Sequence, residues 1–157
     1  METIIKELQI ELNSLIGQKI TTVVSGEPVG SIILIDIGEW NVLFIYSVWR
    51  LTDNGTVLAT WRDSNEIKEG NLVIQTQLLT NDVIDSVNIS EFFDLTIHTI
   101  SGRSLDVFCD IGPKNTDDFT ENWCLANKKN NVYYSINSSY KVKILTYDTS
   151  LPGPRSA

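Results

Sequence analysis

The sequence predicts a single α+β domain, built mainly of antiparallel β-sheet with an amphipathic helix at its N-terminus. Apolar residues recur at helical spacing near the start of the chain, and β-branched runs separated by turn residues fill most of the rest. The length of 157 residues is that of about one domain. We expect residues 1–148 to form this domain and residues 149–157, which lack periodicity, to be a frayed tail.

The predicted helix spans residues 3–16. Its apolar side chains recur every three or four residues and share one face; they are Ile4, Ile5, Leu8, Leu12, Leu15 and Ile16. Thr3 is suited to cap the start of the helix, and Gly17 is suited to end it. A helix with one apolar face needs an element to cover that face, so we expect it to pack on the sheet.

From residue 19 onward, β-branched runs replace the helical pattern. The first three predicted strands are residues 19–25, 30–37 and 41–52. Gly26-Glu27-Pro28 separates the first strand from the second, because glycine and proline favour turns.

Asn54-Gly55 predicts a β-hairpin, because both positions of its tight two-residue turn require a positive φ. With this turn, Leu51 lies opposite Leu58. On the other face, Val48 lies opposite Trp61. Since large apolar side chains then occupy both faces, we expect this hairpin in the middle of the sheet, with the N-terminal helix covering one side.

The second half of the chain predicts further strands. Residues 63–81 are expected to be irregular with one strand, although residues 71–79 can also be interpreted as a short helix; strands follow at residues 83–90, 92–100 and 104–110. The chain then ends in a meander with strands at 123–126, 132–136 and 140–147. In the last of these strands, Lys141 and Lys143 alternate with apolar residues and are expected to point outward.

The turn between strands 92–100 and 104–110 sets their register. A two-residue turn would place Ile97 opposite Asp106, because a one-residue slip exchanges the two faces of a strand. A three-residue turn with Gly102 in the left-handed conformation instead pairs Ile97 with Leu105 and brings Cys109 to the buried face. The opposite face then presents Asp94, Thr96, His98, Ser104, Asp106 and Phe108.

The net charge of −8 is distributed unevenly. Residues 63–121 carry 12 acidic and 3 basic side chains, whereas residues 122–157 carry 1 acidic and 5 basic ones. Nucleic-acid binding requires a continuous basic surface, so no nucleic-acid partner is expected. An acidic surface favours basic protein partners because it speeds their association; solubility is its other common role.

Membrane insertion, secretion and metal binding are not expected either. The longest apolar runs, at residues 31–37 and 42–49, are far shorter than the ~18 residues of a membrane helix. The N-terminus shows no secretory signal pattern. Cys109 and Cys124 form neither a disulfide framework nor a zinc-ligand spacing. These features predict a cytoplasmic protein without a metal or other cofactor.

His98 is the only histidine of the chain. The predicted register places Ser104 opposite it and Asp106 diagonally across the same face, which together are the parts of a nucleophilic triad. However, Ser104 lies in a regular strand, with no Gly-x-Ser-x-Gly turn to expose it. We interpret His98 as a solvated side chain and expect no catalytic residue here.

Two other residue sets leave alternatives open. Asp106 and Asp110, with Asp94 nearby, could act as acid and base in sugar hydrolysis or hold a cation, although the spacing of a calcium loop is absent. A set of aromatic residues could line a pocket, anchor a partner or fill the core; it consists of Trp40, Phe44, Tyr46, Trp49 and Trp61.

A series of short motifs runs along residues 12–136. In order they are Leu15-Ile16-Gly17-Gln18-Lys19-Ile20, Gly30-Ser31-Ile32, Trp49-Arg50-Leu51, Asn81-Asp82-Val83-Ile84, Phe93-Asp94-Leu95-Thr96-Ile97, Gly102-Arg103-Ser104-Leu105 and Asn122-Trp123-Cys124-Leu125. This order resembles that of small uncharacterised bacterial proteins, some of them similar to immunity proteins of contact-dependent and polymorphic toxin systems. The resemblance implies a cytoplasmic α+β protein that has no catalytic residues and acts by binding.

We therefore predict a non-enzymatic binding protein that neutralises a basic toxin domain through an acidic docking surface. The residues expected to form this surface are Asp106, Asp110, Asp117, Asp118 and Glu121. The alternative is a domain that processes a small molecule or a sugar with carboxylates near His98. A third hypothesis is a homo-oligomer, with a homodimer as the simplest case, that buries the apolar faces of residues 41–62 between copies.

Overall fold

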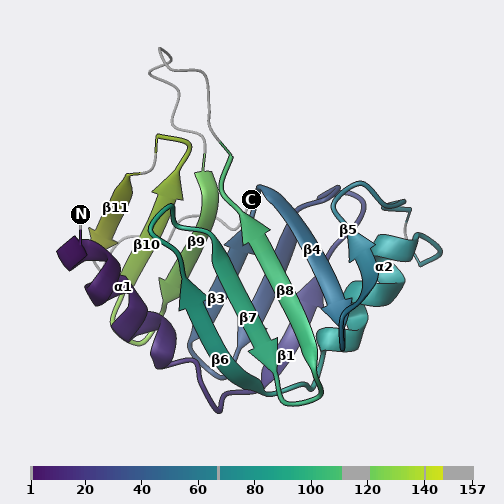
Figure 1. Ribbon diagram of the computed structural model, residues 1–157, viewed down its shortest axis with the longest axis horizontal. Coiled ribbons are helices and arrows are strands. Elements are labelled where there is room, and N and C mark those ends of the chain that lie inside the picture. The colour runs from purple at the N-terminus through teal and green to yellow at the C-terminus, as the bar shows by residue number, and fades with distance from the viewer. Residues whose placement is uncertain (1, 67, 111–120, 140, 147–157) are drawn as a thin grey trace.

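The computed structural model describes residues 2–66, 68–110, 121–139 and 141–146, which form two antiparallel sheets (Figure 1). The strands of the six-stranded sheet are, in order, β1 (Ile20–Val24), β2 (Ile33–Ile37), β3 (Asn41–Ile45), β9 (Glu121–Asn127), β10 (Val132–Asn137) and β11 (Val142–Thr146). Those of the five-stranded sheet are β5 (Thr56–Thr60), β4 (Val48–Asp53), β8 (Arg103–Phe108), β7 (Leu95–Thr99) and β6 (Ile84–Ile89). The predicted α+β class, mainly antiparallel sheet with an N-terminal helix, is confirmed.

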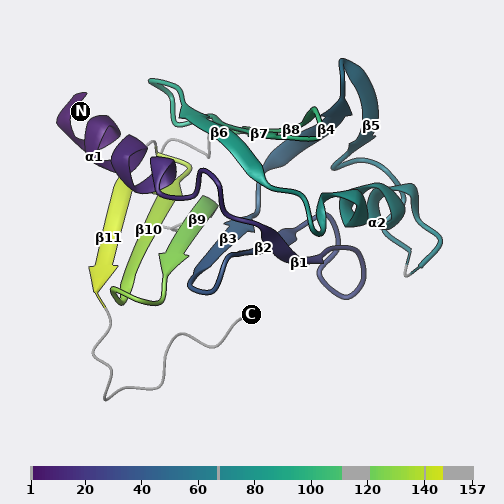
Figure 2. The same ribbon diagram turned by 90° about the horizontal axis from the view of Figure 1, so that it is seen from below.

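The two sheets face each other and a helix closes each open side between them (Figure 2). Helix α1 (Glu2–Asn13) packs against β6, and its Leu8 and Leu12 are fully buried. At the other side, α2 (Asn71–Thr76) packs against β5, and the 3-10 helix η1 (Gln77–Leu79) packs against β1. The core therefore lies between the sheets, with both outer sheet faces turned away from it.

Two tryptophans connect the sheets in opposite directions. Trp49, on β4 of the five-stranded sheet, donates its indole Nε1–H to the carbonyl oxygen of Ser31, just before β2 of the other sheet, at 2.8 Å. Trp123, on β9 of the six-stranded sheet, donates to the carbonyl oxygen of Phe93 in the β6–β7 turn, also at 2.8 Å. Both rings are fully buried, so each satisfies its polar group while filling the core.

Amide side chains of the helices bind the outer edges of three edge strands. Gln9 of α1 donates to the Val87 carbonyl (2.8 Å) and accepts from the Ile89 N–H (3.1 Å) on β6. Gln77 donates to the Val23 carbonyl on β1. In the same way, Asn71 of α2 donates to the Leu58 carbonyl on β5. These contacts occupy backbone groups that would otherwise be open to pairing with another chain.

The predicted strand 41–52 is wrong, because the structure divides it between the two sheets. Residues 41–45 form β3 and residues 48–53 form β4, with Tyr46 and Ser47 between them. The N–H groups of both Tyr46 and Ser47 donate to one carbonyl, that of Asn122, at 2.9 and 3.1 Å. The apolar pattern continues through this bend because both strands face the same core, so periodicity alone did not reveal it.

The hairpin at Asn54-Gly55 forms, but its predicted register and position are wrong. A bulge between Leu51 and Thr52 shifts the pairing, so that Leu51 lies opposite Ala59 rather than Leu58. The hairpin also lies at the edge of the five-stranded sheet, where β5 is the last strand. The N-terminal helix packs against β6, at the opposite edge of that sheet, and does not cover the hairpin.

The irregular segment with one strand predicted at residues 63–81 is also wrong, because α2 and η1 lie there. Their buried side chains are Leu72, Thr76 and Leu79, which are spaced four and three residues apart, as on one face of a helix. The short helix that the sequence left open as an alternative for residues 71–79 is the structure that forms; the polar Thr76 in the middle of the stripe made its helical periodicity weak. The Thr76 hydroxyl is satisfied by the Ser25 hydroxyl at 2.6 Å.

The remaining strand predictions are confirmed with small changes of boundary. Ile97 pairs with Leu105, and Gly102 has a φ of +94°. A Cβ at Gly102 would lie 2.5 Å from the Asn54 side chain, so the turn needs glycine for space as well as for φ. The C-terminal meander also forms, as β9, β10 and β11. The predicted helix 3–16 is shorter, at 2–13, and the predicted tail 149–157 lies outside the described residues.

None of the helices in the described part of the chain is long and apolar enough to cross a membrane.

Candidate functional site

The outer face of the five-stranded sheet is a candidate binding surface, because no described helix or strand lies over it (Figure 1). We call it the polar face. It carries Arg50, Thr52, Thr60, Ser86, Asn88, Thr96, His98, Ser104, Asp106 and Phe108. These residues alternate along their strands with buried ones, so the sheet itself separates them from the core.

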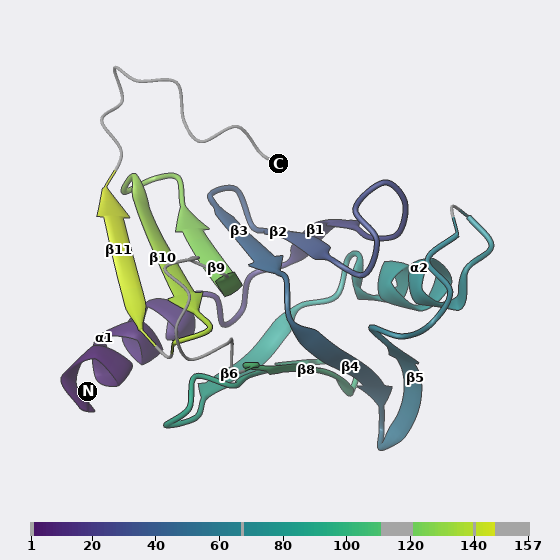
Figure 3. The ribbon, with the colours of Figure 1, turned by 90° about the horizontal axis from the view of Figure 1, so that it is seen from above.

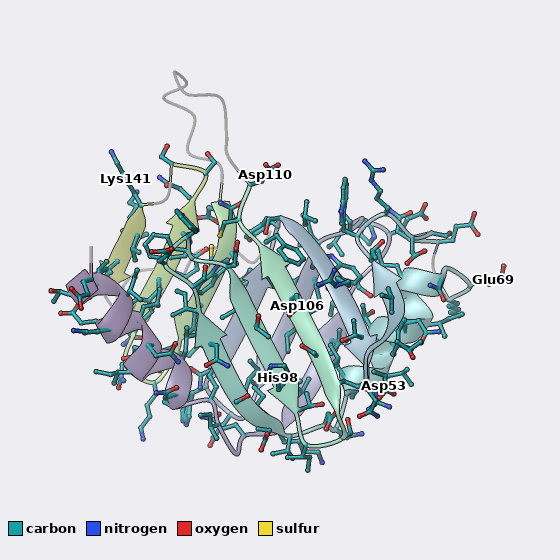
Figure 4. All side chains as sticks on the ribbon, viewed as in Figure 1. Asp53, Glu69, His98, Asp106, Asp110 and Lys141 are labelled. Atoms are coloured by element: carbon teal, nitrogen blue, oxygen red, sulfur yellow. The ribbon has the colours of Figure 1, made fainter. Side chains whose placement is uncertain are left out.

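Asp106 lies in the middle of the polar face and is bound to Arg50 (Figure 4). The register of β4 and β8 places the two residues directly opposite, and the Arg50 Nη2 atom is 3.3 Å from Asp106 Oδ2. The Arg50 guanidinium also lies over the Phe108 ring, 5.3 Å from its centroid. The charge of Asp106 is therefore balanced within the sheet.

A second group of residues lies where β8 ends and the β6–β7 turn approaches it. Cys109 donates its N–H to Asp94 Oδ1 at 2.7 Å, which holds the turn against the end of β8. We call this group the docking end; it consists of Glu91, Phe92, Asp94, Phe108 and Asp110. Phe92 is 61% exposed and Phe108 is 37% exposed, so two aromatic rings lie at the surface among three carboxylates.

The β6–β7 turn holds a strained residue. Phe93 has a φ of +65°, which is rare for a bulky side chain, and its ring is buried. Its carbonyl accepts hydrogen bonds from the Trp123 indole and from the Cys109 thiol. The Ser90 hydroxyl accepts from the N–H groups of Phe92 and Asp94. These contacts determine the turn from several sides and leave Phe92 pointing outward.

Sequence reasoning missed Phe92, although a signal was present. Phe92 and Phe93 are consecutive, and two consecutive side chains next to a strand cannot both reach the same core. One of the two rings therefore had to be exposed, and only the turn conformation decided which.

The triad register predicted around His98 is confirmed, but the hydrogen bonds that a triad needs are not formed. His98 lies opposite Ser104, and Asp106 lies opposite Thr96. The carboxylate of Asp106 binds Arg50 instead. Among the described residues no hydrogen bond involves the His98 imidazole, which is exposed. The triad therefore does not form, and the alternative of a carboxylate site near His98 stays a prediction.

The predicted docking residues do not share one surface. Asp106 lies on the polar face and Asp110 lies at the docking end (Figure 4). Asp117 and Asp118 lie outside the described residues. Glu121 begins β9 of the other sheet, and its side chain lies on the outer face of that sheet. Asp106 and Glu121 therefore point away from each other, on opposite sides of the molecule.

Glu121 is part of a hydrogen-bonded group on the outer face of the six-stranded sheet. Its Oε1 atom accepts from the Ser135 hydroxyl at 3.0 Å. Its Oε2 atom accepts from the Cys124 thiol at 3.0 Å and from the Tyr133 hydroxyl at 3.3 Å. Cys124 and Ser135 are fully buried, although they point away from the core between the sheets. We call these four residues the Glu121 cluster.

Aromatic rings surround the carboxylate of Glu121: that of Tyr133 belongs to the Glu121 cluster, and those of Phe44 and Tyr46 lie next to it. Phe44 and Tyr46 are parallel, with centroids 6.3 Å apart, and Tyr133 is tilted against Phe44 at 6.4 Å. Burial, together with the charges that Cys124 and Glu121 carry when they are ionised, raises the pKa of Tyr46 to about 12. Burial also raises the pKa of Tyr133. Both phenols therefore remain neutral hydrogen-bond donors at physiological pH.

The two cysteines behave as buried thiols. Burial raises the pKa of Cys124 to about 12, and burial with the nearby Asp94 charge raises that of Cys109 to about 12. Cys109 is half-buried rather than fully part of the core. Within the described ranges no group of three or more Cys, His, Asp or Glu side chains is placed to hold a metal ion.

Comparison with protein-family models, with curated proteins and with solved structures finds no match to this chain.

Proposed function

We propose that the protein acts by binding another protein and that it neutralises a basic toxin domain in this way. The docking surface is the docking end together with the adjoining polar face. The observation that carries the proposal is Phe92, an aromatic ring 61% exposed on a turn held in a strained conformation. Exposed aromatic side chains on a rigid support are typical anchors of protein interfaces.

The charges around this ring support a basic partner. Glu91 and Asp110 are exposed, and both lie at the docking end. Asp106 is already balanced by Arg50, so the free negative charge lies at the end of the sheet rather than at its centre. Such an arrangement steers a basic partner toward the aromatic anchors and speeds its association.

The polar face extends the same surface with short hydroxyl side chains. Thr52, Ser104 and Thr96 lie along β4, β8 and β7 beside the Arg50–Asp106 pair. Arginine and aromatic residues are enriched in the centres of protein interfaces, and short polar residues suit their rims. A flat surface of this kind fits a folded protein partner.

Affinity purification of the tagged protein from its own host, followed by native mass spectrometry, tests the proposal. We expect a stoichiometric basic protein. With that partner, Phe92→Ser combined with Phe108→Ser should speed dissociation at least about tenfold. Charge reversal by Glu91→Lys with Asp110→Lys should slow association at low salt.

The matched control is Val24→Ser, at a 43% exposed apolar position on β1 of the six-stranded sheet, which should leave both rates unchanged. Partner binding that is unaffected by both double variants would remove the docking end from the mechanism. Elution of a homodimer or of a monomer with a small bound mass would overturn the proposal as a whole.

A further inference from the structure

Glu121 and Asp106 are both acidic residues on the outer face of a sheet, but their side chains have different partners. Asp106 forms an ion pair with Arg50, whereas none of the ion pairs among the described residues involves Glu121. Its side chain is nevertheless half-buried. The register places Lys143 of β11 opposite Ser135. A half-buried carboxylate that forms no ion pair among the described residues needs a physical explanation.

The hydrogen bonds to Glu121 hold its carboxylate in one orientation. Three donors, from Cys124, Tyr133 and Ser135, contact its two oxygens. An ionised carboxylate offers about four acceptor positions, so these three bonds leave room for one more donor.

The rings next to this carboxylate provide the second part of a site. Phe44 lies near the end of β3 and Tyr46 lies one residue beyond it, and their parallel rings, with centroids 6.3 Å apart, lie side by side. The ring of Tyr133 is tilted against that of Phe44, with the two centroids 6.4 Å apart. All three rings are half-buried, so part of each remains accessible to a ligand. Aromatic faces attract organic cations through the electrostatic field of the ring.

We propose that Glu121, Phe44, Tyr46 and Tyr133 form a binding site for an organic ammonium group. The carboxylate supplies the opposite charge and the rings supply cation–π contacts and apolar surface for methyl or methylene groups. The partly buried setting strengthens both interactions relative to an exposed carboxylate, because water screens them less. The site lies on the outer face of the six-stranded sheet, whereas the rings of the docking end belong to the five-stranded sheet and its β6–β7 turn, and it does not depend on the proposed function.

The ammonium group has two possible sources, a small quaternary amine or a lysine side chain of a protein. Choline and N-acetyl-lysine methylamide represent these two sources. A flat ring surface favours the methylated head, whereas a carboxylate with one free acceptor position favours an N–H donor. Saturable binding of either compound at the Glu121 cluster supports the site, and the tighter of the two identifies the source.

The test uses nuclear magnetic resonance of the full chain with labelled aromatic rings, titrated with tetramethylammonium, choline and N-acetyl-lysine methylamide. We expect saturable shifts confined to the signals of Phe44, Tyr46 and Tyr133. The uncharged analogue of choline, 3,3-dimethylbutanol, should bind at least about tenfold more weakly, because it lacks the charge.

Two variants and one control make the result specific. Glu121→Gln keeps the size and shape of the side chain but removes the charge, and should weaken cation binding about tenfold or more. Tyr46→Leu tests the ring contribution independently, should Glu121→Gln alter the fold. Asp106→Asn, on the polar face, should leave cation binding unchanged. Shifts spread over the surface, or equal binding by wild type and both variants, would overturn the assignment.

Discussion

The two outer faces of the molecule are built by the same alternation of side chains but differ in their environment. On the polar face, Asp106 and Arg50 pair across neighbouring strands while remaining partly exposed, with 21% and 46% of their side chains accessible. On the other face, Cys124 and Ser135 are fully buried beneath Glu121 and the surrounding rings. Alternation therefore decides which side of a sheet a residue lies on, but not whether that side is in contact with water.

Two serines show the difference most directly. Ser104 lies half-buried on the polar face, opposite His98. Ser135 lies fully buried on the other face and donates to Glu121. Both point away from the core between the sheets, yet only Ser135 is part of a buried hydrogen-bond network. Figure 3 shows the two sheets from above, with their outer faces on opposite sides.

The largest expected loss of stability comes from a substitution in the core that lies beneath both faces. Trp123→Ala should lower the free energy of unfolding by about 3–5 kcal/mol, because it removes a large buried ring. It also removes the hydrogen bond to Phe93 that links the sheets. Urea denaturation followed by circular dichroism measures this loss. Trp40→Ala, at a 43% exposed ring, is the control and should cost far less. A loss for Trp123→Ala of under about 1 kcal/mol would contradict the role of this ring.

The second prediction compares the two serines. Ser135→Val should cost about 1–3 kcal/mol, because it removes a buried donor to the Glu121 carboxylate. Ser104→Val should change stability by no more than about 0.5 kcal/mol, since the position is half-buried and valine suits a strand. Equal costs for the two variants, measured by the same denaturation experiment, would mean that the faces do not differ as described.

The third prediction concerns alkaline pH. Cys124 has a pKa of about 12 in the folded protein, against 9.0 for a free thiol, so the folded state keeps its proton where the unfolded state loses it. Stability is therefore fully present below pH 9 and falls as the pH rises toward 12. We expect a loss of about 1 kcal/mol between pH 8 and pH 10 from this thiol.

Cys124→Ala is the variant that isolates this contribution. It should reduce the pH dependence of the unfolding free energy between pH 8 and pH 10 without abolishing it, because the half-buried Cys109 keeps its own contribution. Thiol labelling at pH 8 offers a second readout and should be much slower in the folded protein than in urea. Rapid labelling of Cys124 in the folded state would show that its thiol is more accessible than the structure indicates.

The smallest expected effect is on the polar face. Asp106→Asn removes one half of the ion pair with Arg50, whose side chain is 46% exposed, and should change stability by less than about 0.5 kcal/mol. Added salt should leave this difference small, because water already screens the pair. A loss of unfolding free energy above about 1.5 kcal/mol, measured by thermal unfolding, would show that the ion pair stabilises the fold substantially.

Features that depend on residues close together in the chain were predicted correctly, whereas features that depend on distant segments were not. The β7–β8 register was correct because Gly102 and the alternation on both sides of a short turn specify it locally. The β4–β5 register was wrong because a bulge beside Leu51 shifts the pairing by one residue. A bulge leaves no clear mark on the pattern of apolar residues.

The same limit applied to the candidate sites. The sequence placed Asp106 and Glu121 in one acidic region because they are close along the chain. The structure separates them, since β8 and β9 belong to different sheets. Conversely, Tyr46 and Glu121 are far apart in the sequence and come together only through the pairing of β3 with β9.

The sequence alone determined the α+β class, the N-terminal helix, most of the strands and the alternation of apolar and polar side chains along them. These features depend on contacts between residues that are neighbours in the chain. Only the tertiary structure decided that residues 41–52 divide between two sheets, that Phe92 rather than Phe93 is exposed, and which outer face buries its polar groups. These outcomes depend on how distant segments pack, because burial is a property of the assembled sheets and not of any one strand.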